Sequence, residues 1–318
     1  MNITVLSPGP LTTVQDMGRF GAMDTGFSPG GAMDHSSLVL ANLLVGNSPE
    51  EGVLEMTLMG ASLRFSCDTV ISLTGADMTP KINGIPVPGY QSLFVKKGDE
   101  LTTGYAKSGM RGYLAVAGGF DLPRVMGSLS TNLKCKIGGF QGRKLSQGDQ
   151  IPLKRSSSEA FPVRSLPPLA MPGDVLSLHV IPGPQDDAFT PAGMAHFFTE
   201  EYTVSQTSDR MGIRLEGTSV ESHNGVDIIS DAVTSGSVQI PPSGMPLIMM
   251  ADRQTTGGYA KIATVISADL DSLAQARPGC HIRFHAVSDE IAVLMKKSQR
   301  LQWKRWEEHF PPRLIKED

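Results

Sequence analysis

The apolar segments of this chain are short, and several of them end at glycine or proline. The chain has 34 glycines and 22 prolines among 318 residues, and aromatic residues make up only 6%. Glycine and proline interrupt helices and mark turns, so their high frequency favours many short strands over long helices. The chain is also too long for one small core, which indicates two domains. We therefore predict a mainly β protein with a few short helices.

The stretch of residues 241–279 shows this pattern most clearly. Two apolar runs, Met245–Met250 and Ile262–Ile266, are short enough to be buried strands. The segment between them is rich in polar side chains and in glycines that allow close approach of a ligand. Loops on rigid scaffolds often carry function, so a contact with a ligand or another protein stands beside an ordinary hairpin loop as the interpretation. The loop residues of interest are Asp252, Gln254, Thr255, Thr256, Gly257, Gly258 and Tyr259.

Capping residues predict where several helices begin. Asp34 is a good N-cap for a helix of roughly residues 35–45, and Thr190 followed by proline predicts another helix start. Asp269 predicts the cap of a short helix, and Ser288 predicts the start of a C-terminal helix.

Strands are predicted from short apolar runs. Asn83-Gly84 between two such runs is a specific signal for a tight hairpin. The glycine-rich residues 11–34 predict no regular element before the helix at their end. The other predicted strands are residues 3–6, 53–58, 62–65, 70–73, 113–117, 150–153, 175–181, 211–216 and 238–240.

The domain boundary is expected in a segment that contains three consecutive serines followed by four prolines. We place domain 1 at residues 1–160, a linker at 161–173, domain 2 at 174–288, and a C-terminal helix and tail at 289–318. Ser7-Pro8-Gly9-Pro10 echoes Ile181-Pro182-Gly183-Pro184, and weaker echoes follow in the same order. These echoes favour two similar β-barrels related by internal duplication, since closing a sheet removes its exposed edges.

Composition excludes several function classes. The net charge of −4 gives no electrostatic reason to expect nucleic acid or an anionic membrane as a partner. The apolar run Met245–Met250 is far too short to span a membrane. Three widely spaced cysteines fit neither a disulfide framework nor a metal site, and we expect a reducing, cytoplasmic location. His281 and His285 share a strand face but have no third ligand nearby, so no metal site is predicted.

Polar residues beside glycines are the remaining candidates for chemistry. Asp16 and Arg19 predict either a site for an anion or an internal salt bridge that braces the loop. Asp209 and Arg210 repeat the same Asp-Arg-Gly theme in the second half, again with a structural and a functional interpretation. Ser128, Ser130 and Thr131 form a hydroxyl-rich run. This run predicts either a contact with a phosphate or carboxylate group of a ligand, or a turn that is capped by its own side chains. The P-loop, the dinucleotide fingerprint and the nucleophile elbow are all absent from the sequence.

Long motifs in both halves resemble a known family, the KipA-like proteins or 5-oxoprolinase C-subunits, akin to part of the carboxyltransferase region of urea carboxylase. The resemblance extends from about Ile3 to Phe284. The motifs that carry it are GPLTTVQDMGR (residues 9–19), GGAMD (30–34), YLAVAGGFD (113–121), MGSLST (126–131), SDRMG (208–212) and ADRQTTGGY (251–259).

The resemblance implies two cyclophilin-like β-barrel domains and a role in an ATP-dependent enzyme that opens 5-oxo-L-proline to L-glutamate. It also implies two partner proteins, one KipI-like and one LamB/YcsF-like, with ATP and Mg at a site shared within the complex. The chain has no biotinylation segment, so biotin is not expected on it. Asp252 and Asp16 would then be the catalytic candidates. The substrate-binding candidates would be Arg19, Ser128, Ser130, Thr131, Asp209, Arg210, Gln254, Thr255, Thr256, Gly257, Gly258 and Tyr259.

Two other functions stay open at this point. The same surface could bind a KipI-like inhibitor of a histidine kinase, which would make the chain a regulatory protein. It could also transfer a carboxyl group from biotin on a separate carrier protein to a urea-like acceptor. Composition and spacing name no reaction, and predict only two β-barrels whose polar loops line a cleft.

Overall fold

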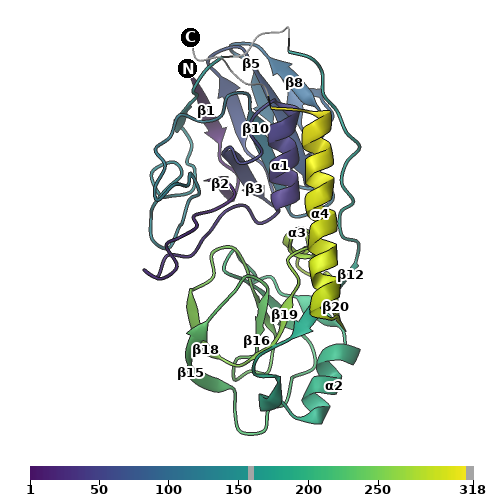
Figure 1. The fold of residues 1–318 in the computed structure, drawn as a ribbon. Helices are drawn as coiled ribbons and strands as arrows, with labels where there is room; N and C mark the ends of the chain where they lie inside the picture. Colours follow the sequence, from purple (N-terminus) through teal and green to yellow (C-terminus); the bar gives the residue numbers. More distant parts are fainter. Residues whose placement is uncertain (157–160, 313–318) are drawn as a thin grey trace. The chain divides into compact units, whose positions relative to one another are not determined.

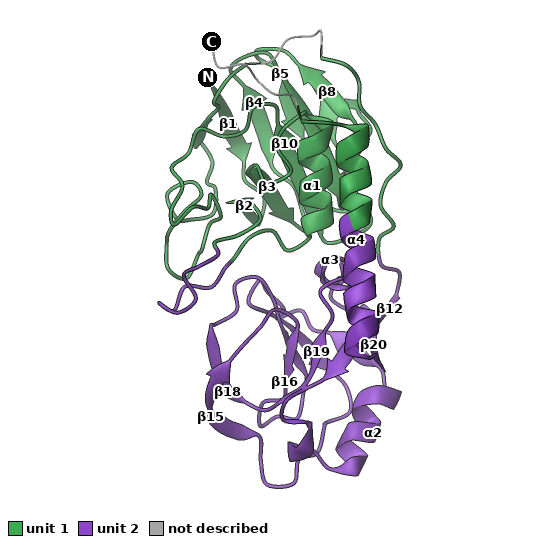
Figure 2. Ribbon diagram, viewed as in Figure 1, with its two compact units in different colours: residues 1–19, 30–171, 301–318 green, residues 20–29, 172–300 purple. Residues whose placement is uncertain are grey.

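The structure, a computed structural model, describes residues 1–156 and 161–312. Its contacts divide the chain into two compact units (Figure 2). Unit 1 comprises residues 1–19, 30–171 and 301–318, and unit 2 comprises residues 20–29 and 172–300.

Unit 1 contains helix α1 (His35–Leu44), the last part of helix α4 (Asp289–His309) and the first strands of the chain (Figure 1). These strands are β1 (Asn2–Ser7), β2 (Leu11–Gln15), β3 (Val53–Thr57), β4 (Ser62–Phe65), β5 (Thr69–Gly75), β6 (Lys81–Ile82), β7 (Ile85–Pro86), β8 (Ser92–Val95), β9 (Glu100–Thr102), β10 (Arg111–Val116) and β11 (Gln150–Pro152).

Unit 2 contains the remaining strands and most of the helices. Its strands are β12 (Val175–Pro182), β13 (Tyr202–Val204), β14 (Gly212–Glu216), β15 (Asp227–Ala232), β16 (Ser237–Gln239), β17 (Leu247–Met249), β18 (Thr256–Tyr259), β19 (Lys261–Val265) and β20 (His281–Ala286). Its helices are the 3₁₀ turn η1 (Asp186–Ala188), α2 (Pro191–Thr199), α3 (Leu270–Ala274) and the first part of α4 (Asp289–His309).

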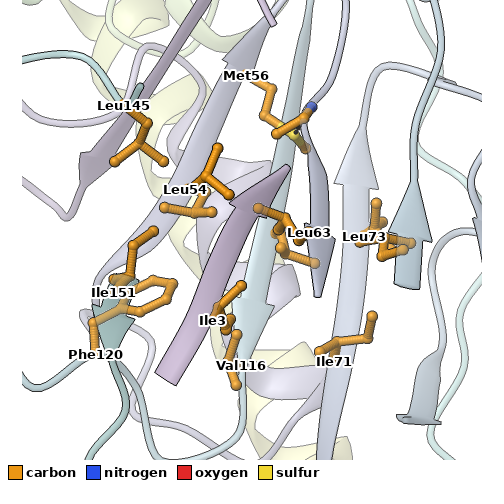
Figure 3. Packing of buried hydrophobic residues seen from close by; sticks show 14 of the residues in the cluster. Ile3, Leu54, Met56, Leu63, Ile71, Leu73, Val116, Phe120, Leu145 and Ile151 are labelled. Carbon is orange, nitrogen blue, oxygen red and sulfur yellow. Dashed lines mark hydrogen bonds between the residues drawn. The ribbon is translucent and has the colours of Figure 1, made fainter. Parts of the chain in front are cut away.

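The strands of unit 1 form two sheets that share a core. One sheet has the order β11-β1-β4-β9-β6-β7 and the other β2-β3-β10-β5-β8. Buried residues from strands of both sheets form one hydrophobic cluster, which includes Ile3, Leu63, Leu73, Val116 and Ile151 (Figure 3). The sheets therefore lie face to face, because their strands supply side chains to the same cluster.

The second face of the five-stranded sheet is covered by helix. In β10, Leu114 and Val116 belong to the core between the sheets, whereas Tyr113 and Ala115 belong to a second cluster with α1. Successive side chains of a strand point to opposite faces, so β10 is buried on both. This explains why its sequence is a continuous apolar run rather than an alternating one.

The predicted cap of α1 is confirmed. The Asp34 carboxylate accepts hydrogen bonds from the Ser37 backbone N–H at 2.9 Å and from the Ser37 hydroxyl at 2.6 Å. These contacts satisfy one of the backbone donors that a helix N-terminus leaves unpaired. The Asn83-Gly84 hairpin is confirmed as well, since β6 pairs with β7 and both turn residues have positive φ.

Unit 2 is a closed barrel with the strand order β12-β19-β16-β17-β14-β13-β20. The ring closes where β20 pairs in parallel with β12. Phe197 of α2 stacks on Phe284 of β20 with ring centroids 4.3 Å apart, which fixes that helix to the barrel. Thr190 caps α2 as predicted, by accepting from the Gly193 N–H at 2.9 Å.

The prediction of a mainly β protein with a few helices is confirmed, and unit 2 has the expected closed barrel. Unit 1 reaches its packed core with two sheets instead of one closed ring. The first and last strands of each unit also pair differently, because β1 is antiparallel to β11 whereas β12 is parallel to β20. The internal duplication stays a prediction.

Two segments expected to be irregular are strands. Residues 11–15 form β2, which pairs along its whole length with β3. Thr256–Tyr259, expected in a loop, form β18 and pair with β15 in a separate two-stranded sheet. The β-branched residues of β2 favour a strand, and only the glycines that follow it suggested an irregular segment, whereas in β18 cross-strand hydrogen bonds outweigh the low strand propensity of its two glycines.

The segment expected to be a linker packs against unit 1. Ser165 bridges to Gln91, and the Leu166 N–H donates to the Tyr90 carbonyl at 3.0 Å. The buried Arg164 guanidinium donates to the Leu43 carbonyl at 2.7 Å. The prolines suppress regular structure here, but backbone and side-chain hydrogen bonds hold residues 161–171 in place. Part of the serine run and the last residues of the predicted tail, 157–160 and 313–318, lie outside the described residues.

Among the described residues, none of the helices combines the length and the apolar character needed to span a lipid bilayer.

Candidate functional site

Asp16, at the end of β2, is the centre of a buried hydrogen-bond cluster in unit 1. Its carboxylate accepts from the hydroxyls of Ser128 (2.7 Å) and Ser130 (2.5 Å) and from the N–H groups of Gly18 (2.9 Å) and Leu129 (2.6 Å). The Arg124 guanidinium lies 3.5 Å from the second carboxylate oxygen. Only 4% of the Asp16 side chain is exposed. The predicted Asp16 and hydroxyl-rich groups are thus brought together.

Arg19 holds the same loop from its other side. The buried guanidinium donates to the carbonyls of Val125 at 3.0 Å and Ser130 at 2.9 Å. Thr131 donates its hydroxyl to the Val14 carbonyl at 3.0 Å, away from the carboxylate. A buried carboxylate and guanidinium with protein partners of this kind position a loop, because each contact replaces one that water would have made.

A second cluster in unit 2 contains Arg210 and Asp252. The Arg210 Nε lies 2.9 Å from one Asp252 carboxylate oxygen, and its Nη2 lies 3.0 Å from the other. This bidentate pair is the strong form of an ion pair, and it is reinforced by the Asp252 N–H donating to the Arg210 carbonyl at 2.9 Å. Arg210 is buried, but 13% of the Asp252 side chain is exposed.

The other predicted residues of unit 2 differ in their surroundings. Asp209 accepts from the N–H groups of Met211 and Gly212, so it forms a local turn. Gln254 and Thr256 are exposed, and Thr255 and Tyr259 are half-buried. Gly257 is packed so closely that an added Cβ would lie 2.6 Å from Nε2 of Gln239.

A buried lysine flanks β18 and was not among the predicted site residues. Lys261 Nζ donates to the Ala232 carbonyl at 3.0 Å and contacts the Asp231 carboxylate. That hydrogen bond from Lys261 holds the pKa of Asp231 below its usual range. The contact ties β19 to β15, the strand that pairs with β18.

A cavity of about 690 Å³ lies within unit 1. Residues of β5, the β6–β7 hairpin, β10 and residues 168–171 line it, and none of the predicted site residues does. Sequence reasoning missed this feature.

A family model described as "Carboxyltransferase domain, subdomain A and B" matches residues 25–286 of the chain. The chain belongs to this family.

Relatives within the carboxyltransferase-domain family align with almost the whole chain. The chain is 41% identical over 303 residues to the 5-oxoprolinase C-subunit of Haemophilus influenzae. The alignment covers 93% of this chain and 95% of the relative. The protein of the same name from Escherichia coli is 38% identical over 298 residues, which covers 94% of this chain and 95% of the relative. The resemblance indicated by the sequence motifs is confirmed.

A solved structure of the K. lactis urea amidolyase superposes on this chain with a TM-score of 0.87 at 31% sequence identity. The match covers 96% of this chain but only 20% of the urea amidolyase chain. The carboxyltransferase-domain fold is therefore one part of that longer protein.

The carboxyltransferase-domain chain also contains a buried polar network behind the cavity. The Tyr113 hydroxyl donates to the Glu55 carboxylate at 2.9 Å and accepts from the Asp34 N–H at 2.9 Å. Burial, then the charges of Glu55 and Asp34, raise the pKa of Tyr113 well above its usual value. A single charged residue within an otherwise apolar predicted strand, such as Glu55, is the sequence signal that could have revealed this network.

The described part of the chain holds no cluster of metal ligands. Among residues 1–156 and 161–312, no group of three or more His, Cys, Asp or Glu side chains could hold a metal ion. His285 instead lies 3.3 Å from the Ser177 hydroxyl, and each of the three cysteines is free.

Proposed function

We propose that this chain is the C-subunit of an ATP-dependent 5-oxoprolinase complex that hydrolyses 5-oxo-L-proline to L-glutamate. The observation that carries the proposal is the 41% identity with the Haemophilus influenzae C-subunit along 93% of this chain and 95% of that protein. A shared fold alone would not support a shared function, but an end-to-end alignment supports the same place in an assembly.

The proposal includes two partners in the cytoplasm, a KipI-like protein and a LamB/YcsF-like protein. Both relatives are named as subunits, which supports function in a complex. ATP, with Mg, would act at a site that the three proteins share, and its hydrolysis to ADP and phosphate would drive ring opening. In the ring opening, water adds to the lactam carbonyl carbon and the C–N bond breaks. The nitrogen takes up a proton as the amino group of glutamate.

We place the substrate contact of this chain at residues 252–259. The substrate carries a carboxylate, a lactam N–H and a lactam carbonyl, and amide and hydroxyl side chains can both donate to and accept from such groups. Gln254, Thr255 and Thr256 supply these groups at or near the surface. Of the two carboxylates proposed to act on the substrate, Asp252 is the more accessible, because its side chain is 13% exposed and that of Asp16 is 4% exposed.

The test is glutamate formation from 5-oxoproline and ATP by the three purified proteins. The mixture should form glutamate, and omission of this chain should abolish it. Absence of ATP-dependent glutamate from the full mixture, or an undiminished rate without this chain, would overturn the proposal.

Variants locate the contact within the complex. Asp252→Asn should lower kcat at least tenfold while the complex still assembles, and Gln254→Ala should raise KM for 5-oxoproline. Thr218→Val is the matched control, because Thr218 is exposed in the same unit but lies outside residues 252–259. Unchanged kinetics in Asp252→Asn and Gln254→Ala would remove the substrate from this loop.

The family description and the urea amidolyase structure favour a second candidate, transfer of a carboxyl group from biotin. Biotin would then be attached to a separate carrier protein. This candidate predicts carboxylation of urea or a related amide when carboxybiotin on such a carrier is supplied, and it fails if the carrier keeps its carboxyl group.

A further inference from the structure

The cavity in unit 1 has the size and composition of a small-molecule site. Its volume of about 690 Å³ lies within the range of roughly 300–1,000 Å³ that is usual for such sites. Most of its lining is apolar, and a few polar groups are gathered with them, as in ligand pockets. The apolar lining residues are Met56, Leu73, Ala76, Met78, Pro80, Pro86, Val87, Pro88, Tyr90, Tyr113, Pro168, Leu169 and Met171.

Two tyrosines give the cavity a rigid aromatic wall. The Tyr90 hydroxyl donates to the Gly75 carbonyl at 3.1 Å and accepts from the Gly75 N–H at 3.0 Å. The Tyr113 hydroxyl is held between Glu55 and Asp34. Both hydroxyls already have protein partners, so the rings are fixed; Tyr90 keeps a small exposed edge at the cavity, and the fully buried Tyr113 supports the wall from behind. Burial first, and then Asp34, raise the pKa of Tyr90, so this wall carries no phenolate charge near neutral pH.

The exposed lining residues carry a net positive charge. Lys81, Lys107 and Asp77 line the cavity and are exposed. Asp77 uses one carboxylate oxygen to accept from the Thr79 N–H at 2.9 Å. Across residues 1–156 and 161–312, neither lysine ammonium makes a hydrogen bond or ion pair with protein. A lysine ammonium without a protein partner is available as a point charge for an anion.

We propose that this cavity binds an organic anion with an apolar body, whose body lies against Tyr90, Val87 and Leu169 and whose anionic group contacts Lys81 and Lys107. An adenine nucleotide and an apolar carboxylate both have this chemistry. The proposal does not depend on the substrate contact proposed above, because none of residues 252–259 lines the cavity.

The test measures binding of anilinonaphthalene sulfonate, a fluorescent anion with an apolar body, to the full chain at neutral pH. We expect saturable binding that the double variant Lys81→Ala/Lys107→Ala weakens at least tenfold. Lys97→Ala is the matched control, because Lys97 is an exposed lysine of the same unit that does not line the cavity, and it should leave binding unchanged. Equal affinity in the wild type and the double lysine variant would overturn the proposal.

A second variant tests the apolar part of the site. Val87 is half-buried in the lining, so Val87→Trp should fill the cavity and weaken binding of the same probe. Circular dichroism and the unfolding midpoint check that the variant is folded. Full-strength binding by a folded Val87→Trp protein would contradict the proposal.

Competition identifies the class of anion. Displacement of the probe by ATP would indicate an adenine nucleotide, and displacement by octanoate would indicate an apolar carboxylate. Failure of both to displace it would exclude both classes of anion and overturn the proposal.

Discussion

Substitution of a single buried polar side chain can raise or lower the free energy of unfolding, and Tyr202 is one example. Tyr202 of β13 lies among Phe197 and Phe284, with ring centroids 6.4 and 5.9 Å away, and its side chain is fully buried. Its hydroxyl has no hydrogen-bond partner among the described residues. A buried hydroxyl without a partner loses its contacts with water and gains nothing in exchange.

Tyr202→Phe should therefore raise the free energy of unfolding by about 1 kcal/mol at neutral pH. Burial, and then Glu200, raise the pKa of Tyr202 to about 12, above the value of about 10 in the unfolded chain. The unfolded state loses its proton first, so wild-type stability should fall between about pH 10 and 12, and Tyr202→Phe should lack this part of the fall. Urea unfolding at several alkaline pH values measures both effects. Parallel profiles for the two proteins would contradict the assignment.

Asp149 should control stability at acid pH. The Arg143 guanidinium donates to both of its carboxylate oxygens, at 2.7 and 2.8 Å, and this hydrogen bonding lowers the pKa of Asp149. The contribution is present above the unfolded pKa of about 3.9 and is lost as the pH falls through the folded pKa. Asp149→Asn should thus be less stable by about 1 kcal/mol at neutral pH, and this difference should shrink at an acid pH well below about 3.9. Denaturant unfolding at both pH values checks this, and a constant difference would rule it out.

At the scale of elements, the repeated Pro-Gly-Pro motif has a packing role in both units. An added Cβ on Gly9, after β1, would lie 2.6 Å from the Met59 carbonyl oxygen. An added Cβ on Gly183, after β12, would lie 2.0 Å from the Lys261 carbonyl oxygen. The echo between the halves therefore marks places where the chain passes directly against the backbone of another segment, and only glycine fits there.

Gly183→Ala should consequently destabilise unit 2 by about 1–3 kcal/mol, because the methyl group forces backbone to move. Gly173→Ala is the matched control, since an added Cβ at Gly173 meets nothing within 4 Å. The unfolding midpoints of the two variants compare them directly. Equal midpoints for Gly183→Ala and Gly173→Ala would show that the backbone at the β12–β19 contact can move to make room for a methyl group without loss of stability.

At the scale of the whole molecule, each unit is assembled from distant parts of the chain. Residues from 301 onward belong to unit 1, although α4 begins in unit 2. Trp303 donates its indole N–H to the Ser36 hydroxyl at 2.9 Å, and Trp303, Trp306 and the buried Phe310 pack on the α1 cluster. The core of unit 1 is therefore incomplete until the end of the chain is in place.

Phe310→Ala should cost about 3 kcal/mol in the unfolding of unit 1, since it removes a buried ring from that core. Both tryptophans of the chain lie in the same segment. Their fluorescence should therefore shift to longer wavelength at a lower denaturant concentration in Phe310→Ala than in the wild type. Leu301→Ala, at a residue 50% exposed on the same helix, should change stability by less than about 0.5 kcal/mol. Similar midpoints for the two variants would contradict a core role for the C-terminal residues.

Sequence reasoning failed where the partner of a residue is distant. The sequence predicts that Asp269 caps α3, and Asp269 does precede that helix, but its carboxylate accepts from the His179 N–H at 2.7 Å instead of capping the helix. Proximity in the sequence pairs Asp16 with Arg19, but the hydroxyl donors of Asp16 lie more than 110 positions away. Residues 161–171 have the composition of a linker, and only contacts of Arg164 with Ser92 of β8 and Leu43 of α1 show that they are part of unit 1.

The sequence by itself determined many of the short strands, the caps of α1 and α2, the Asn83-Gly84 hairpin and the family, because each depends on neighbouring residues or on long contiguous motifs. Only the tertiary structure decided which carboxylates are enclosed, how the two sheets of unit 1 share a core, and where the cavity lies. These features depend on contacts between side chains that are distant in the sequence and come together only on folding. The spacing of residues along the chain does not predict such contacts.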